Sequence, residues 1–199
     1  MLDIIITSHE EDDLDRESYS NLQGCNVYYN EFQPSVNHAR LLAIDTGTSE
    51  YMMWLDGDDD ISFRFLQRFI NELHELRPAI GLYSPMICRP LVGRSHVEIC
   101  DLLVDITPKS THMAFAFKRS YAKEQKDLFN EFIWGDYILR SKLLSEPCKY
   151  FLRSNSPRFY TWNQKLSSRS GRLYPKDSEL EVMFKYVNSL KKKLIGETL

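Results

Sequence analysis

Four carboxylates gather in one short stretch of the chain, directly after the strand candidate EYMMWL at 50–55. They are Asp56, Asp58, Asp59 and Asp60, with Gly57 between the first two. That many like charges repel one another unless a cation is present. Carboxylate oxygens are the preferred ligands of Mg²⁺ and Mn²⁺, and an ion held there beside a diphosphate offsets the repulsion of the phosphates. The stretch therefore predicts a divalent-metal site next to a diphosphate.

Three other kinds of acidic loop were weighed against this interpretation. A solvated turn would cap the following helix through Asp60 or Ser62. An EF-hand loop needs Gly at its sixth position and Glu at its twelfth, where this chain has Ile61 and Gln67. A haloacid-dehalogenase-type phosphotransferase needs an aspartate after the first strand, where Thr7 stands. The last two patterns disagree with the sequence, and the capping turn stays open.

The surrounding pattern predicts strands that alternate with helices. Apolar and β-branched runs predict strands over 2–7, 26–32, 50–55, 80–87, 97–103 and 112–117. Apolar residues at helical spacing predict helices over 14–22, 36–45, 62–76, 136–144 and 179–194. This alternation predicts the α/β class, with a mostly parallel sheet flanked by helices in a single domain.

Polar side chains follow two of the predicted strands. Thr7 and His9 come after the first, and Asp56 comes after the third. Ligands of open α/β sheets bind beyond the carboxyl ends of the strands. We therefore expect these side chains to line one binding site.

Three motifs between 39 and 61 keep a fixed spacing. The runs Ala39–Ile44, Glu50–Tyr51 and Leu55–Asp59 read ARLLAI, EY and LDGDD. They resemble the A-R-N-x-G-I, G-E-Y and L-D-x-D-D motifs of the family 2 glycosyltransferases, which have the Rossmann-like GT-A fold. The resemblance extends from Leu2 to about Ser170.

The resemblance implies roles for five residues. Asp56 and Asp58 correspond to the D-x-D pair, with Asp58 as the direct ligand of Mn²⁺ or Mg²⁺ and Asp56 as a partner of the metal or the nucleotide. Thr7 and His9 fall where the family contacts the nucleotide base, and Arg40 matches the arginine of A-R-N. An exposed arginine or histidine at the start of a helix has an equally good structural explanation.

A further motif lies at Trp134–Arg140, WGDYILR, which resembles the family's G-E-D-Y-x-L-x-x-R segment. Its aspartate, Asp136, implies the general base of an inverting transfer, which removes the proton of the acceptor hydroxyl. The alternative is a helix N-cap. The family's paired glutamate is Gly135 here, and Glu131 is a candidate to compensate.

Other positions match loosely or depart from the family. Tyr160 and Thr161 belong to an aromatic run, 159–162, before a polar loop that resembles the family's diphosphate-closing loop and is equally explained as a solvated loop. The acid expected after the second strand is absent, which leaves Asn30, Glu31 or neither for the base or ribose. Leu41 replaces an asparagine and Ser49 replaces a glycine.

Bulk properties favour a small globular protein. The formal net charge of −3 gives no overall attraction to nucleic acid, and the four cysteines form no C-x-x-C pair. No run approaches the roughly 18 to 20 apolar residues of a membrane span, and the start of the chain is unlike a signal peptide. A cytoplasmic location is expected.

The expected activity is transfer of a sugar from a nucleotide-diphosphate donor, a UDP-sugar, to a hydroxyl. Residues 1–60 would bind the donor, 61–170 the acceptor, and 171–199 would form a loop and a surface helix. The acceptor is a glycan, a lipid-linked saccharide or a modified base in DNA. The oligomeric state stays open. The alternatives are a non-catalytic nucleotide-sugar-binding module and a nucleotidyltransferase, whose Gly-rich basic loop is absent after the first strand.

Binding to DNA would need a basic face. Candidate cations are Arg89, Arg94, Lys118, Arg119, Lys185 and Lys191–Lys193. A solvated helix end explains the last group equally well, because cations complement the helix dipole there.

Overall fold

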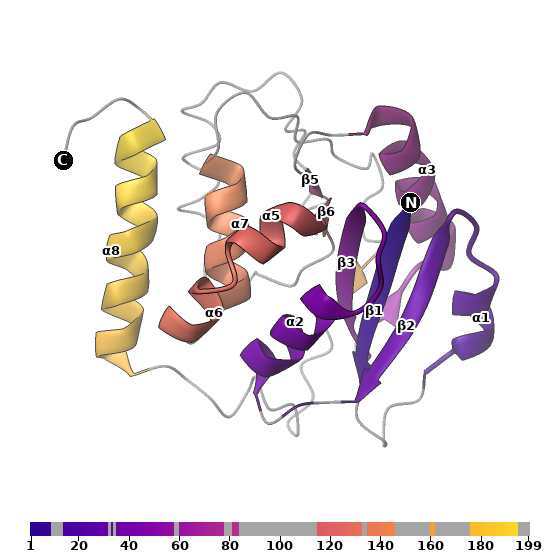
Figure 1. Ribbon diagram of the computed structural model, residues 1–199, viewed down its shortest axis with the longest axis horizontal. Helices are drawn as coiled ribbons and strands as arrows, with labels where there is room; N and C mark the ends of the chain where they lie inside the picture. The colour runs from indigo at the N-terminus through magenta and orange to yellow at the C-terminus, as the bar shows by residue number, and fades with distance from the viewer. Residues whose placement is uncertain are drawn as a thin grey trace.

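Five strands form the central sheet in the order β2-β1-β3-β6-β5 (Figure 1). The computed structural model describes residues 1–8, 14–31, 33, 35–57, 60–77, 81–83, 115–132, 135–145, 160–161 and 176–194. The strands are β1 Leu2–Ser8, β2 Cys25–Glu31, β3 Tyr51–Asp56, β5 Gly81–Tyr83 and β6 Phe115–Lys118. A second sheet pairs β4 Asp60–Ile61 with β7 Tyr160–Thr161.

The sheet is mostly parallel, as predicted. β1 pairs in parallel with both β2 and β3, whereas β6 runs antiparallel to both β3 and β5. Because β6 is reversed against both of its neighbours, the other four strands point the same way. The carboxyl ends of these four strands therefore lie at one edge of the sheet, and the carboxyl end of β6 lies at the opposite edge.

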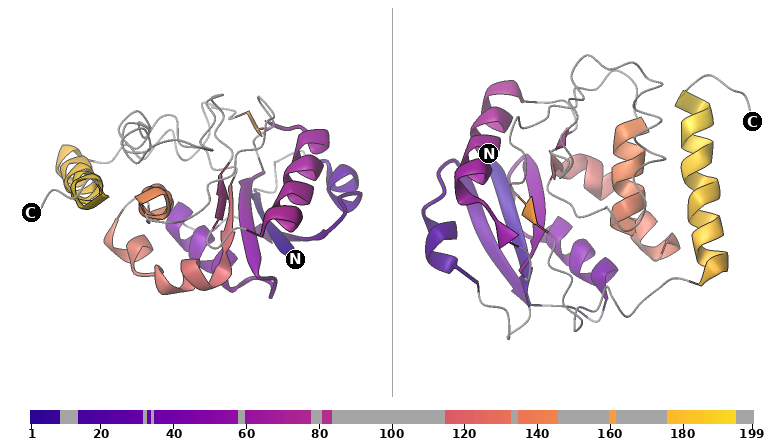
Figure 2. Two further views of the ribbon diagram at one scale, coloured as in Figure 1. Left: turned by 90° about the horizontal axis from the view of Figure 1, so that it is seen from above. Right: turned by 180° about the vertical axis from the view of Figure 1, so that it is seen from behind.

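The near-continuous apolar composition of β1 reflects burial of both faces of the sheet. Ile4 and Ile6 join one apolar cluster, and Ile5, between them, joins another. Helices α1 (Arg16–Ser20) and α3 (Phe63–Leu76) cover the first face. Helix α2 (Val36–Asp45) covers the second, so the sheet is the middle layer of three (Figure 2).

Four more helices complete the described chain. They are α5 Arg119–Glu124, α6 Leu128–Glu131, α7 Gly135–Ser145 and α8 Asp177–Leu194. All but α8 lie near α2, and α8 packs beside α7 on the side away from the sheet (Figures 1 and 2). None of the helices in the described part of the chain is long and apolar enough to span a membrane.

The predicted elements agree with the structure in order and type. Most bounds differ by no more than two residues. Of the strands predicted over 80–87 and 112–117, the structure has Gly81–Tyr83 and Phe115–Lys118 as strands, and positions 80, 84–87 and 112–114 lie outside the described residues. The predicted strand 97–103 lies outside the described residues. Helices α5 and α6 were not predicted, because helices of six and four residues are too short to establish a period.

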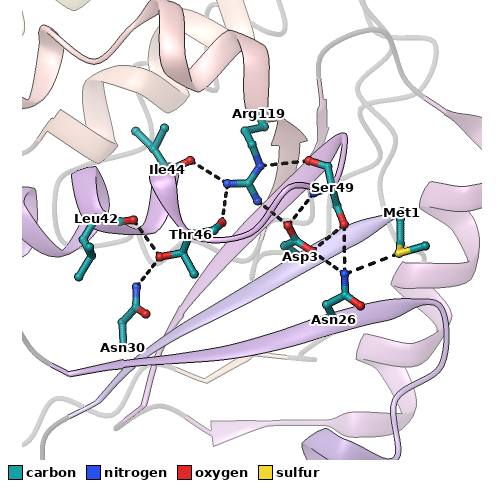
Figure 3. A network of polar contacts seen from close by, with 9 residues as sticks. All are labelled: Met1, Asp3, Asn26, Asn30, Leu42, Ile44, Thr46, Ser49 and Arg119. Carbon is teal, nitrogen blue, oxygen red and sulfur yellow. Dashed lines mark hydrogen bonds and ion pairs between the residues drawn. The ribbon is translucent and has the colours of Figure 1, made fainter.

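A buried polar network lies near the amino end of β1 (Figure 3). The Asp3 carboxylate is fully buried and accepts hydrogen bonds from Ser49 Oγ (2.6 Å), Ser49 N (2.8 Å), Asn26 Nδ2 (2.9 Å) and Arg119 Nη2 (2.7 Å). Arg119 also donates to the carbonyl oxygens of Ser49, Ile44 and Thr46. The network joins β1, β2, the loop before β3 and the start of α5.

Candidate functional site

Thr7 and Asp56 are register partners at the carboxyl ends of β1 and β3. The backbone N–H of Gly57 donates to the carbonyl oxygen of Thr7 at 2.8 Å, which ties the turn after Asp56 to β1. The predicted meeting of the residues that follow the first and third strands is confirmed for this pair. His9, the other residue predicted after β1, lies outside the described residues.

Gly57 packs directly on the end of β1. A Cβ atom at this position would lie 2.7 Å from Ser8 Cβ and 3.1 Å from Ser8 Cα. Both distances are shorter than a normal carbon–carbon contact, so only glycine fits without a shift of the backbone. The residue between Asp56 and Asp58 is therefore glycine because the acidic turn lies against β1.

The hydroxyl of Thr7 is buried and has no hydrogen-bond partner among the described residues. A buried hydroxyl that stays without a hydrogen-bond partner lowers the stability of the folded protein by about 1–3 kcal/mol. Thr7 follows Ile5 on the face of the sheet that packs against α2, and its register partner on β3 is Asp56.

Arg40 projects from α2 onto the end of β3. Its side chain is 3 % exposed, and Nη2 donates to Asp56 Oδ1 at 2.7 Å. The guanidinium carbon lies 5.4 Å from the centre of the Trp54 ring. The interpretation of Arg40 as an exposed residue at a helix start is wrong, because the cation is enclosed between strand and helix.

The same guanidinium reaches Asp136, another predicted site residue. Arg40 Nε lies 3.6 Å from Asp136 Oδ2, an ion-pair distance. Asp136 is in the first turn of α7, which begins at Gly135, so the helix N-cap alternative for Asp136 is wrong. Its other oxygen, Oδ1, accepts from the N–H of Tyr137. One buried arginine thus connects Asp56 with Asp136, which are far apart in the sequence.

Asn37, three residues before Arg40 on α2, was missed by the sequence analysis. Its Nδ2 donates to the carbonyl oxygens of Phe129 and Phe132, both at 2.7 Å. Its Oδ1 accepts from the N–H of Gly135 at 3.2 Å. The spacing of three from Arg40, which places both side chains on one helix face, is the signal that could have identified it.

The structure accounts for glycine at position 135. A Cβ atom there would lie 2.7 Å from both Cα and Cδ1 of Phe129. The space that the family's paired glutamate would need is therefore filled by backbone as well as by the ring. Glu131, the candidate to compensate, is exposed at the end of α6.

The metal part of the prediction lies largely outside the described chain. Asp58 and Asp59 belong to the undescribed residues, and within the described ranges no three His, Cys, Asp or Glu side chains are grouped to hold an ion. Ser62 is the N-cap residue of α3 but makes no side-chain cap bond. Pairing of β4 with β7 brings Tyr160 and Thr161 beside the end of the acidic stretch.

Two positions that depart from the family pattern make hydrogen bonds within the protein. Ser49 supplies two of the hydrogen bonds that Asp3 accepts. Asn30 donates to Thr46 Oγ1 at 3.0 Å (Figure 3).

The predicted basic DNA-binding face loses one of its members. Arg119 is 5 % exposed and belongs to the Asp3 network, so its assignment to that face is wrong.

Comparisons with known proteins identify the fold. No protein-family model matches the sequence, and no curated protein sequence matches it significantly. Among solved structures, S. aureus TarS 1–349 in complex with UDP superposes with a TM-score of 0.62 at 9 % identity, over 98 % of this chain and 70 % of TarS 1–349. The complex with UDP-GlcNAc gives 0.61 at 10 % identity and the same coverage. A third structure of TarS 1–349 gives 0.55 at 11 % identity, and this chain spans 59 % of its length.

These likenesses are between structures, at identities too low to carry more than the fold. The chain has the GT-A-like α/β fold, as a single compact domain.

Proposed function

We propose that this protein is a glycosyltransferase that moves a sugar from a nucleoside-diphosphate donor, a UDP-sugar, to a hydroxyl acceptor. The observation that carries the proposal is the Arg40 side chain, which contacts both Asp56 and Asp136. Asp56 is the carboxylate expected beside the donor diphosphate, and Asp136 is the carboxylate expected beside the acceptor, so one arginine contacts both. The complexes of TarS with UDP and with UDP-GlcNAc support a UDP-sugar donor on the same fold.

The donor would bind at the carboxyl ends of β1 and β3. The Thr7 hydroxyl lies there without a described partner, and His9 follows two positions later in the sequence. Asp56 is about one third exposed, and within the described chain only its Oδ1 is engaged, by Arg40. Its second oxygen is therefore available to a ligand.

Mn²⁺ or Mg²⁺ would be held by Asp58 and Asp56. Asp56 fits this role because its partly exposed carboxylate offers the oxygen ligands that these cations prefer. When bound, the ion would supply positive charge that stabilises the departing diphosphate.

Asp136 would act as the general base of an inverting transfer. Its carboxylate accepts the proton of the acceptor hydroxyl while that oxygen bonds to the anomeric carbon, and the bond from this carbon to the diphosphate breaks. Arg40 lies between Asp136 and Asp56 and offsets the repulsion between the two carboxylates. The acceptor would be a glycan, a lipid-linked saccharide or a hydroxymethylated base in DNA.

The test needs no knowledge of the acceptor. Binding of UDP and a panel of UDP-sugars is measured by thermal shift with and without Mn²⁺, and slow donor hydrolysis is followed as release of UDP. Asp58→Asn is expected to abolish the metal-dependent shift. Asp136→Asn is expected to keep the shift and lower UDP release about a hundredfold or more. Asp45→Asn, an exposed surface change at the far end of α2, serves as the matched control.

One observation favours a second candidate, a nucleotide-sugar-binding module without catalysis. The paired acid of the family is replaced by Gly135, and Phe129 fills the space of its side chain. This candidate predicts metal-dependent UDP-sugar binding with no UDP release above the rate in buffer. Release that depends on Asp136 would exclude it. Absence of any metal-assisted binding would reject both candidates.

A further inference from the structure

Asn37 makes three hydrogen bonds to the backbone of the segment that leads into α7. The Nδ2 group donates to the carbonyl oxygens of Phe129 and Phe132, and Oδ1 accepts from the N–H of Gly135. An Asn side chain has two N–H donors and one acceptor oxygen, and here both donors and the oxygen bond to the same segment of backbone. The partners lie 92 to 98 positions away, which makes this a tertiary anchor and not a local cap.

Among the described residues, Asn37 is the side chain that bonds three backbone groups of this segment. Phe129 and Phe132 are 3 % and 8 % exposed. Gly135 is the first residue of α7, so its N–H has no acceptor within the helix. Asn37 satisfies all three groups, and its loss would leave them without their described partner.

The anchor acts on the residue next to Asp136. Gly135 is held by Asn37 on one side and packs without a side chain against Phe129 on the other. One turn further along α2, Arg40 contacts the Asp136 carboxylate itself. The face of α2 that carries both residues therefore fixes the backbone of this turn through Asn37 and the side chain of Asp136 through Arg40.

We propose that Asn37 is a positioning residue: its hydrogen bonds to the backbone of Phe129, Phe132 and Gly135 hold the start of α7 so that Asp136 faces Arg40. Asn37 itself contacts the protein backbone and acts through Asp136. The inference rests on the proposed function for its catalytic consequence, but the anchoring can be measured without any activity.

The catalytic consequence is tested by a double-mutant cycle on UDP release. Asn37→Ala is expected to lower kcat about ten- to a hundredfold, because a displacement of about 1 Å at a reacting group has an effect of that size. The KM for the donor and the Kd for UDP are expected to stay within about twofold. In an Asp136→Asn background, Asn37→Ala is expected to cause no further loss, since it acts only through Asp136.

His38→Ala is the matched control. His38 lies in the same turn of α2 but is exposed, and its ring nitrogen contacts Ser35. This variant should keep wild-type kcat and KM. If Asn37→Ala does not fold, Asn37→Ser, which retains one short donor and acceptor, is expected to show a smaller loss of the same kind.

Amide hydrogen exchange tests the anchor independently. Peptides that contain Gly135 are expected to exchange faster in Asn37→Ala than in the wild type or in His38→Ala. Unchanged exchange, or an equal loss of kcat with and without the Asp136 carboxylate, would overturn the proposal for Asn37. Failure of the wild type to bind or cleave a UDP-sugar would reject the proposed function instead, while the exchange result would still decide the anchor.

Discussion

Arg119 Nη2 donates to Asp3 Oδ2 at 2.7 Å although 116 positions separate the two residues. The carboxylate is fully buried, and the arginine is nearly so. Burial raises the pKa of Asp3. Hydrogen bonds from Ser49 and Asn26 and the positive charge of Arg119 lower this pKa, and together they outweigh the effect of burial. The pKa of Asp3 in the folded protein therefore lies below its ordinary value of 3.8. The ion pair fixes the amino end of the sheet, opposite the edge with Thr7 and Asp56.

Asp3→Asn is expected to destabilise the protein by about 3 kcal/mol, because removal of one partner leaves a buried charge without its counterion. The carbonyl oxygens around Arg119 limit the cost to the lower end of the usual range. The free energy of unfolding from urea titration measures the effect. Asp45→Asn removes an exposed pair with Lys126 and should cost no more than about 1 kcal/mol. Equal costs for the two variants would contradict the importance of the network.

The same carboxylate makes stability depend on pH. Because the pKa of Asp3 is lower in the folded than in the unfolded chain, its ionised form contributes stability that is fully present above about pH 4. This contribution is lost as the pH falls through the folded-state pKa. Between pH 5 and pH 2, the unfolding free energy of the wild type should therefore fall more steeply than that of Asp3→Asn. Parallel curves would show that Asp3 does not contribute.

Thr7→Val is expected to separate folding from ligand binding. The change replaces a buried hydroxyl that has no described partner by a methyl group of similar size. It should leave the free protein equally stable or stabilise it by up to about 1 kcal/mol. If the hydroxyl binds the nucleotide, the Kd for UDP should rise about three- to tenfold, which isothermal calorimetry would detect. An unchanged Kd would remove Thr7 from the donor site.

Gly57→Ala is expected to disturb the acidic turn. The added Cβ would lie 2.7 Å from Ser8 Cβ and 3.2 Å from the carbonyl oxygen of Thr7. Overpacking of this kind costs about 1–3 kcal/mol and would displace the turn between Asp56 and Asp58. The melting temperature of the free protein should fall. The rise of the melting temperature that UDP causes in the presence of Mn²⁺ should become smaller.

A second substitution tests the cause assigned to this effect. Ser8→Gly removes the atom nearest to the new methyl group, although Ser8 Cα would still lie 3.1 Å away. The double variant Ser8→Gly/Gly57→Ala should therefore recover part of the stability lost in Gly57→Ala, after correction for Ser8→Gly alone. Strictly additive effects would show that the two residues do not compete for space.

The adjacency of Thr7 and Asp56 could be predicted from the sequence because it follows from the geometry of a parallel sheet. Residues after β1 and β3 must lie close together when the strands are parallel neighbours, and Thr7 and Asp56 do. The resemblance to a family identified Arg40 and Asp136 but gave no contact between them. It also left open the alternatives of an exposed Arg40 and an N-cap Asp136, both of which the structure contradicts.

The sequence by itself determined the order of the elements, the two-sided burial of β1 and the position of the acidic stretch at a strand end. These features depend on periodicity and on neighbours along the chain, which the sequence states directly. Only the tertiary structure decided that Arg40 joins two carboxylates, that Asn37 anchors Gly135 and that Arg119 is buried against Asp3. Periodicity specifies which face of a helix is apolar. The partners of the polar residues depend instead on how helices and sheet pack together, and partners such as Gly135 and Asp3 lie about a hundred positions away in the sequence.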